Sequence, residues 1–79
     1  MDKRCVRYAF DMKKNHYYRN IQYNYYYYKC IEHNHIPSHQ LYIKVLTFDS
    51  KSKRQYLNYL WKWDKVVEVD KEDIMAKML

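Results

Sequence analysis

Residues 16–30 read HYYRNIQYNYYYYKC and hold seven of the eleven tyrosines, while the whole sequence of 79 residues contains no glycine. Tyrosine joins a large flat ring to a polar hydroxyl and is enriched at recognition surfaces. Within residues 17–31 the odd positions are the more apolar, and the even positions combine polar side chains with Tyr18, Tyr26 and Tyr28. This alternation predicts a tyrosine-lined β-strand. Since strands rarely exceed about ten residues, we expect a bend near residues 19–20 or at Asn24.

The segments around this stretch predict further strands and two helices. In residues 3–12 the two faces of an extended chain differ in character, as in a half-buried strand. Residues 41–48 are apolar at both odd and even positions, as in a central strand that is covered on both faces. Residues 33–40 contain the only proline and predict a loop. Between residues 52 and 65 the large apolar side chains fall within an arc of about 200° on a helical wheel, so we expect an amphipathic helix. Residues 66–69 predict a short strand, followed by a last helix that begins near Asp70 and Asp73.

The resulting order, β-β-β-α-β-α, predicts an α+β fold. We expect a single domain, residues 1–79, in which helices pack on one face of a small antiparallel sheet. A chain of this length buries roughly 60% of the surface that its unfolded form exposes, which leaves no room for a large internal substrate cavity. Because glycine is absent, residues at positive φ are expected among Asn, Asp and His, with Asn15, Asn20, Asn24 and Asn34 as candidates.

Charge and hydropathy narrow the class of partner. Fifteen Lys and Arg against nine Asp and Glu give a net charge of +6, which favours polyanions such as nucleic acid or acidic protein surfaces. The longest apolar or aromatic run is residues 25–28, so we expect no transmembrane helix and no membrane partner. The N-terminal residues lack the apolar region of a secretory signal, and two cysteines are too few for a disulfide scaffold. These features predict a cytoplasmic location.

The first part of the predicted binding site is a row of tyrosines. If helices cover the odd-numbered side of residues 17–31, then Tyr18, Tyr26 and Tyr28 face outward, with Arg19 and Lys29 beside them. Exposed rings of this kind stack on unpaired bases or anchor protein interfaces, a homodimer included. Two alternatives stay open: the rings are core, or helices cover the even side. In the second case the displayed tyrosines are Tyr23, Tyr25 and Tyr27.

The second part is basic. Lys51, Lys53 and Arg54 surround the expected N-terminus of the helix at residues 52–65. Positive side chains oppose the helix dipole there, unless an anion binds the same amides. The structural alternative is a solvated loop that tolerates lysine.

Metal and catalytic chemistry receive little support from the sequence. Zinc-type side chains occur in the spacing C-x2-H-x-H-x3-H at Cys30, His33, His35 and His39. The usual zinc pattern brings two ligand pairs from separate elements, so we interpret these as surface histidines and expect no metal and no cofactor. The chain contains neither a phosphate-binding glycine loop nor a nucleophile elbow. We therefore predict that it is not an enzyme.

These features together predict a small non-enzymatic binding protein. The small size, the absence of glycine and the wealth of tyrosine and lysine resemble accessory proteins of phages and other mobile elements, many of which block a host enzyme by occupying its surface. We expect an inhibitor of a nucleic-acid-processing machine, of anti-CRISPR or anti-restriction type, with a protein or nucleoprotein target. The alternatives are a regulator that binds DNA or RNA directly and a small RNase-like toxin.

Overall fold

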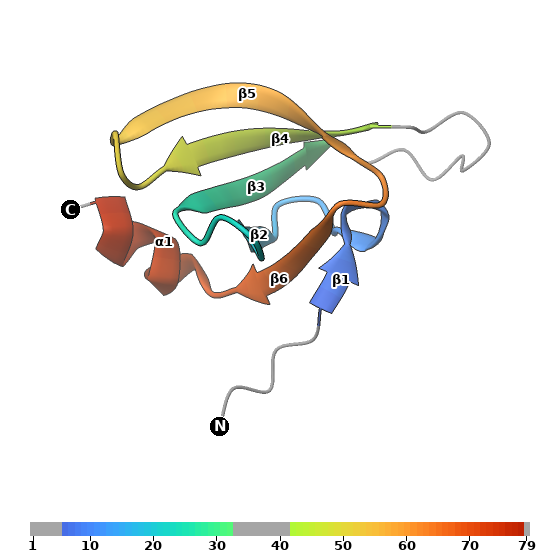
Figure 1. Ribbon diagram of the computed structural model, residues 1–79, viewed down its shortest axis with the longest axis horizontal. Coiled ribbons are helices and arrows are strands. Elements are labelled where there is room, and N and C mark those ends of the chain that lie inside the picture. The colour runs from blue at the N-terminus through green and yellow to red at the C-terminus, as the bar shows by residue number, and fades with distance from the viewer. Residues whose placement is uncertain (1–5, 33–41, 79) are drawn as a thin grey trace.

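The computed structural model describes residues 6–32 and 42–78, which form a six-stranded antiparallel sheet with one 3-10 helix and one α-helix (Figure 1). The elements in chain order are β1 (Val6–Tyr8), η1 (Ala9–Asp11), β2 (Tyr17–Asn20), β3 (Tyr26–Glu32), β4 (Tyr42–Asp49), β5 (Arg54–Trp61), β6 (Lys65–Val69) and α1 (Lys71–Met78). The strand order in the sheet is β1-β6-β2-β3-β4-β5. The described chain is mostly β, so the predicted α+β fold, with helices packed on one face of the sheet, is wrong.

The error lies in residues 52–65, which were expected to form a helix. They contain the end of a turn, the strand β5 and a second turn. β5 pairs with β4 over its full length, from Arg54 opposite Asp49 to Trp61 opposite Tyr42. Aromatic and branched side chains fit a pleated surface well, and the wide apolar arc contained residues from both faces of this strand. The predicted helical face therefore does not exist.

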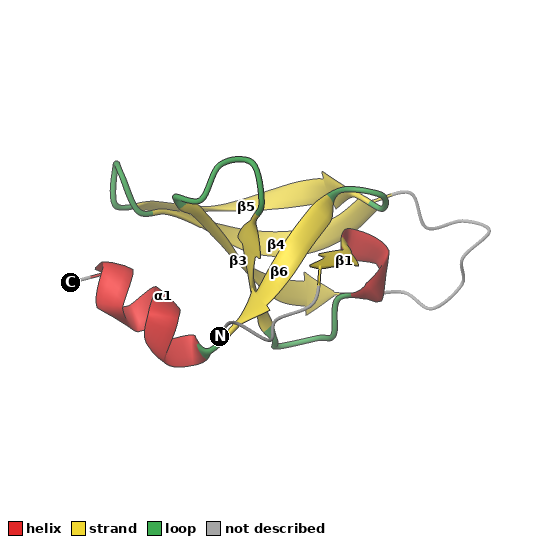
Figure 2. Ribbon diagram, turned by 60° about the horizontal axis from the view of Figure 1, so that its bottom comes forward, coloured by secondary structure: helices red, strands yellow, loops and turns green. Residues whose placement is uncertain are grey.

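The sheet curls strongly along its length. β5 and β6 are joined by residues 62–64 alone, although β2, β3 and β4 lie between them in the strand order. The end of β5 must therefore approach the start of β6. Two hydrogen bonds from η1 hold this closure: the Ala9 amide donates to the carbonyl of Asp64 at 2.7 Å, and the Phe10 amide donates to Lys62 at 3.0 Å. Figure 2 shows the curved sheet, with α1 beside one end of it.

The curl gives the sheet a concave inner face and a convex outer face, each with its own buried cluster. The inner cluster contains Ala9, Met12, Tyr18, Tyr28, Cys30, Ile43, Val45, Leu60 and Val66. The outer cluster is smaller and joins Tyr27, Phe48 and Val69 to Ile74 of α1. A single short helix thus covers only one end of the outer face.

Several local predictions are confirmed. β6 and α1 lie where a strand and a last helix were expected. Asp73 Oδ2 accepts a hydrogen bond from the Asp70 amide at 3.2 Å, which is the return bond of a capping box. The single bent strand expected at residues 17–31 is wrong: β2 and β3 are separate antiparallel strands, joined by a complete chain reversal. The loop predicted at residues 33–40 lies outside the described residues.

Without glycine, the turns of this chain are formed in two ways: by other residues at positive φ, and by a side-chain hydrogen bond. Asn15 has a φ of 68°, as predicted for an asparagine. Lys53 has a φ of 63° in the turn between β4 and β5, although lysine was not among the expected residue types. Asn20 serves differently: its Oδ1 accepts a hydrogen bond from the Tyr23 amide at 2.8 Å and so stabilises the reversal after β2.

Candidate binding surface

The predicted tyrosine row faces the interior of the curled sheet. Tyr18 is fully buried and Tyr28 is 4% exposed. The prediction that these two rings face outward is therefore wrong. Tyr26 is half-buried on the same inner face. The physical reason is the curl: α1 covers part of the odd-numbered face, while the even-numbered face closes on itself. Tyr18, Tyr27 and Tyr28 are therefore buried, whereas Tyr23, in the reversal between β2 and β3, is 47% exposed.

The hydroxyls of the two buried tyrosines are used inside the protein. Tyr18 accepts a hydrogen bond from the Lys13 amide at 2.8 Å, and Tyr28 accepts one from Asn20 Nδ2 at 2.9 Å. Burial raises the pKa of Tyr18 above its ordinary value, although the bond from Lys13 acts in the opposite direction. Burial likewise raises the pKa of Tyr28, against the bond from Asn20. These two residues belong to the core.

Arg19 and Lys29 lie on the opposite face of the sheet from Tyr18 and Tyr28, and both are half-buried. The Lys29 ammonium lies 5.9 Å from the centre of the Tyr17 ring. Arg19 lines a hollow beside α1, together with Lys77. The predicted grouping of these two cations with the inner tyrosines is therefore wrong, because alternate residues of a strand point to opposite faces.

Lys51, Lys53 and Arg54 lie at the turn between β4 and β5, and the expected helix N-terminus is absent from this part of the described chain. Asp49 organises the turn: its Oδ1 accepts hydrogen bonds from the amides of Lys51 at 2.9 Å and Ser52 at 3.3 Å. Partial desolvation opposes ionisation of Asp49, but these amide bonds and the Lys51 charge together lower its pKa. The loop alternative thus describes this basic patch better than the helix.

Two of the three basic side chains contact other parts of the protein. The Lys53 ammonium donates a hydrogen bond to the carbonyl of Lys77 near the C-terminal end of α1. The Lys51 ammonium lies 4.6 Å from the centre of the Tyr25 ring. Lys53 therefore has a structural role, joining the β4–β5 turn to the helix.

The candidate metal ligands fall partly outside the described residues, since His33, His35 and His39 are not among them. Cys30 is buried in the inner cluster, and burial raises the pKa of its thiol. Within the described ranges, no group of three or more His, Cys, Asp or Glu side chains is arranged to hold a metal ion.

A surface that sequence reasoning missed runs along the outer face of β4 and β5. The cross-strand pairs on this face are Tyr42 with Trp61, Lys44 with Tyr59, Leu46 with Leu57, and Phe48 with Gln55. We call the first three pairs the outer β4–β5 face. Leu57 and Tyr59 are each 59% exposed, and the rings of Tyr42 and Trp61 meet edge to face with their centres 5.6 Å apart. These six residues include one lysine and no carboxylate.

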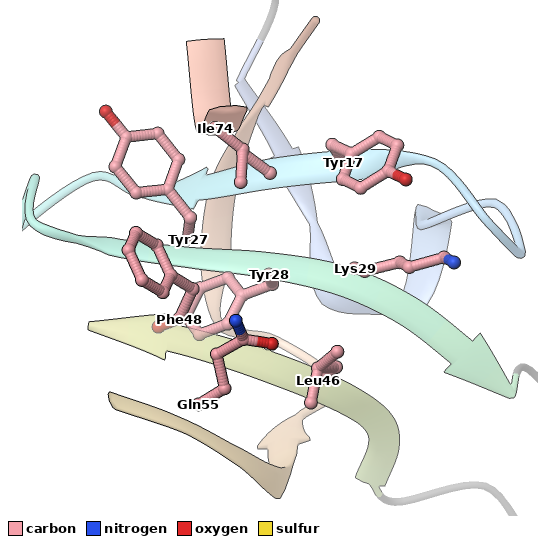
Figure 3. Close-up of a pocket in the computed structure, with 8 residues that line it drawn as sticks. All are labelled: Tyr17, Tyr27, Tyr28, Lys29, Leu46, Phe48, Gln55 and Ile74. Atoms are coloured by element: carbon pink, nitrogen blue, oxygen red, sulfur yellow. The ribbon is translucent and has the colours of Figure 1, made fainter. Parts of the chain in front are cut away.

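The outer β4–β5 face continues into a hollow of about 210 Å³ that reaches α1. Figure 3 shows Tyr27, Phe48 and Ile74 toward one end of the hollow, and Lys29 and Leu46 toward the other. Leu46 belongs to both the hollow and the outer β4–β5 face. Apolar and aromatic side chains therefore extend from the helix to the far end of β5, with lysines set among them.

Comparison of the chain with protein-family models, with curated proteins and with solved structures found no match. Over the described residues, no helix combines the length and the apolar character needed to cross a membrane.

Proposed function

We propose that this chain is a small non-enzymatic binding protein that docks on an acidic protein surface of a nucleic-acid-processing machine and inhibits or modulates it. The observation that carries this proposal is the outer β4–β5 face. It exposes Leu57, Tyr59 and Trp61 side by side along one strand. Large exposed side chains that alternate along an edge strand are typical of interaction surfaces, and Trp and Tyr supply much of the binding energy at interfaces.

The edge position of β5 favours a protein partner over nucleic acid. β5 is the last strand in the order and pairs with β4 on one side only, so the described residues provide no strand for its other edge. An edge strand of eight residues offers a row of backbone donors and acceptors that matches another polypeptide strand. A nucleic acid has no such repeating backbone pattern. Strand addition at β5, with Tyr59 and Trp61 as anchors, is the expected mode.

Charge complementarity selects the kind of protein surface. Lys44 lies within the outer β4–β5 face, and Lys29 lies on the same side of neighbouring β3. Lys51 and Arg54 lie at the turn where β5 begins, and the whole chain carries a net charge of +6. Such a surface attracts an acidic partner and speeds its encounter. The anti-CRISPR or anti-restriction type of action rests on the resemblance in composition to accessory proteins of mobile elements, and the charge bears only on the acidic character of the docked surface.

The test uses the purified full chain with purified CRISPR effector complexes and restriction enzymes. We expect inhibition of DNA cleavage near equimolar ratio and a complex that survives size-exclusion chromatography. The double variant Tyr59→Ala with Trp61→Ala should weaken inhibition by about thirtyfold or more, as expected for two interface anchors. Tyr8→Ala is the matched control, because Tyr8 is an exposed tyrosine on β1, at the opposite edge of the sheet from β5.

Other outcomes would contradict the proposal. Tight binding to bare single-stranded or duplex DNA, with an affinity that falls steeply with salt and depends on Tyr59, would identify a direct DNA or RNA regulator instead. Cleavage of RNA by the purified chain would identify a small RNase-like toxin. Failure to bind or inhibit any of these machines would refute the inhibitor assignment.

A further inference from the structure

A second hollow opens on the inner face of the sheet, on the side of β5 opposite to the outer β4–β5 face. Its volume is about 210 Å³, and its lining comes from the end of β2, from the β2–β3 reversal and from strands β3, β4 and β5. The lining consists of four tyrosine rings and three uncharged polar side chains: Tyr23, Tyr26, Tyr28, Tyr56, Asn20, Thr47 and Asn58. We call this hollow the inner pocket. The described residues that line it carry no charged side chain.

Thr47 is the feature that points to a ligand. Its side chain is 1% exposed and lines the pocket between Tyr28 and Tyr56, which are its cross-strand neighbours. Its Oγ1 has no hydrogen-bond partner among the described residues. A buried hydroxyl left without a partner costs about 1–3 kcal/mol, and most such groups in proteins are satisfied. A ligand atom that reaches it through a small movement of the neighbouring tyrosine rings would satisfy it.

The walls of the pocket are partly fixed in position. Asn20 Nδ2 donates to the Tyr28 hydroxyl, and Asn20 Oδ1 accepts from the Tyr23 amide. These two bonds hold one wall in place. Across the pocket, Asn58 presents an amide with both a donor and an acceptor, from a residue of β5 that is exposed to solvent. The rings of Tyr23 and Tyr26 lie with their centres 6.1 Å apart at a steep angle, so they form two sides of a corner.

We propose that the inner pocket binds one unpaired nucleobase. The ligand is uncharged because the lining is uncharged, and it is flat because aromatic rings supply the walls. It carries both donors and acceptors because Thr47 and Asn58 offer both. The volume is below the roughly 300 Å³ of most small-molecule sites, which fits a single ring system. Bases outside a duplex are recognised in this way, by stacking on aromatic rings and by hydrogen bonds to their edges.

Cations lie near the rim, where a phosphate attached to such a base would project. Tyr25 packs on Tyr26 with ring centres 4.5 Å apart, and the Lys51 ammonium lies over Tyr25. Arg54 is one row along the inner face from Tyr56 in the register of β4 and β5. A nucleobase reaches the pocket either as a free nucleotide or as one unit of a single strand, and the chemistry inside the pocket is the same for both.

The experiment is an NMR titration of the full chain, labelled with ¹⁵N, with each of four uncharged nucleosides. At least one nucleoside should shift the amide signals of Thr47, Tyr56 and Asn58 in a saturable manner. Ribose 5-phosphate is the control ligand, and it should leave these signals in place. Equal effects of ribose 5-phosphate and the nucleosides, or no effect of any nucleoside, would overturn the proposal.

Two variants test the pocket residues. Tyr56→Ala should weaken nucleoside binding at least tenfold, because a stacking wall is lost. Thr47→Val should weaken it about fivefold to tenfold and leave the melting temperature equal or higher, because a methyl group replaces a hydroxyl without a protein partner. Tyr59→Ala, on the outer face of the same strand, is the matched control and should bind nucleosides as the wild type does. Unchanged affinity in Tyr56→Ala would overturn the assignment.

A final arm separates the two sources of the base. The titration is repeated with nucleoside monophosphates and with a short single-stranded oligonucleotide of the preferred base. Comparable affinities identify a free nucleotide, whereas tighter and salt-dependent binding of the oligonucleotide identifies a strand. Either result supports a nucleobase in the pocket. Since Tyr59 and Trp61 take no part here, the docking function can fail while this inference holds, and the reverse is also true.

Discussion

At the level of single residues, Tyr18 and Tyr28 act as core residues, each with one internal hydrogen bond through its hydroxyl. Tyr18 has no exposed surface, and its hydroxyl accepts the Lys13 amide at 2.8 Å. A phenylalanine would fill the same space but would leave that amide without this acceptor. Tyr18 therefore serves both packing and the satisfaction of a backbone group inside a small sheet.

Replacing Tyr18 with phenylalanine isolates that hydrogen bond. Tyr18→Phe should lower the free energy of unfolding by about 1 kcal/mol, measured by urea denaturation, because the ring is retained and one buried bond is lost. Tyr17→Phe is the matched control, since Tyr17 is the neighbouring tyrosine on the opposite face and is only half-buried. Its effect should stay within about 0.5 kcal/mol. Equal effects of the two substitutions would show that the Lys13 bond contributes no stability.

At the level of elements, the turn between β4 and β5 determines where the basic patch lies and how α1 is attached. Asp49 receives the amides of Lys51 and Ser52, and its carbonyl accepts the Lys53 amide at 2.7 Å. Lys53 adopts a φ of 63°, where a side chain with a Cβ is strained by about 1–2 kcal/mol. Lysine nevertheless occupies this position, and its ammonium donates a hydrogen bond to the Lys77 carbonyl of α1.

Two substitutions at Lys53 separate the backbone strain from the side-chain contact. Both Lys53→Gly and Lys53→Ala remove the contact with Lys77, so the difference between their free energies of unfolding reports the backbone at residue 53 and not the side-chain contact. Glycine relieves the strain but gains conformational freedom in the unfolded chain. We expect the glycine variant to exceed the alanine variant by about 0.5–1 kcal/mol in the free energy of unfolding. Equal stability in urea denaturation would contradict a left-handed residue at this position.

The sequence predicts the local elements better than the sheet that they build. The short strand at 66–69 and the start of α1 near Asp70 depend on neighbouring residues, and these predictions are confirmed. The single bent strand predicted at residues 17–31 is wrong, because this segment forms two antiparallel strands. β5 was missed because all of its residues except Leu60 are exposed, so its sequence lacks the alternation of a half-buried strand. The candidate surface was missed with it, since Leu57, Tyr59 and Trp61 share a face only if the segment is a strand.

At the level of the whole molecule, the curl of the sheet decides which residues can meet a partner. β6, the last strand in the sequence, pairs with both β1 and β2, so strands from opposite ends of the described chain lie side by side. Such contacts join residues far apart in the sequence, and no local pattern reports them. Closure turns Tyr18, Tyr26 and Tyr28 toward the inner face of the sheet. It leaves side chains of β5 exposed on both faces of that strand. The outer face carries the proposed docking surface, and the inner face carries the inner pocket.

Closure also places several ionisable groups in the inner cluster, with a consequence for stability at high pH. Burial raises the pKa of Cys30 above its ordinary value of 9.0, and it raises the pKa of Tyr18 and Tyr28 above 10.0. The folded protein therefore holds these protons more tightly than the unfolded chain does. Below pH 9 both states are protonated at these groups, and their contribution to stability is complete. It is lost as the pH rises, because the unfolded chain ionises first.

We therefore expect the free energy of unfolding, measured by urea denaturation between pH 7 and pH 11, to fall from about pH 9 upward. Tyr28→Phe removes one of the three groups and should make the fall shallower than in the wild type. Tyr59→Phe, which removes an exposed hydroxyl from the outer face, is the control. A reducing agent in every sample keeps Cys30 as a thiol. Because the net charge of +6 declines over the same range, weaker charge repulsion acts in the opposite direction in all three proteins. Comparing the proteins by the slope of the free energy of unfolding against pH removes this shared effect. Identical slopes for Tyr28→Phe and the wild type would contradict a closed inner face around Tyr28.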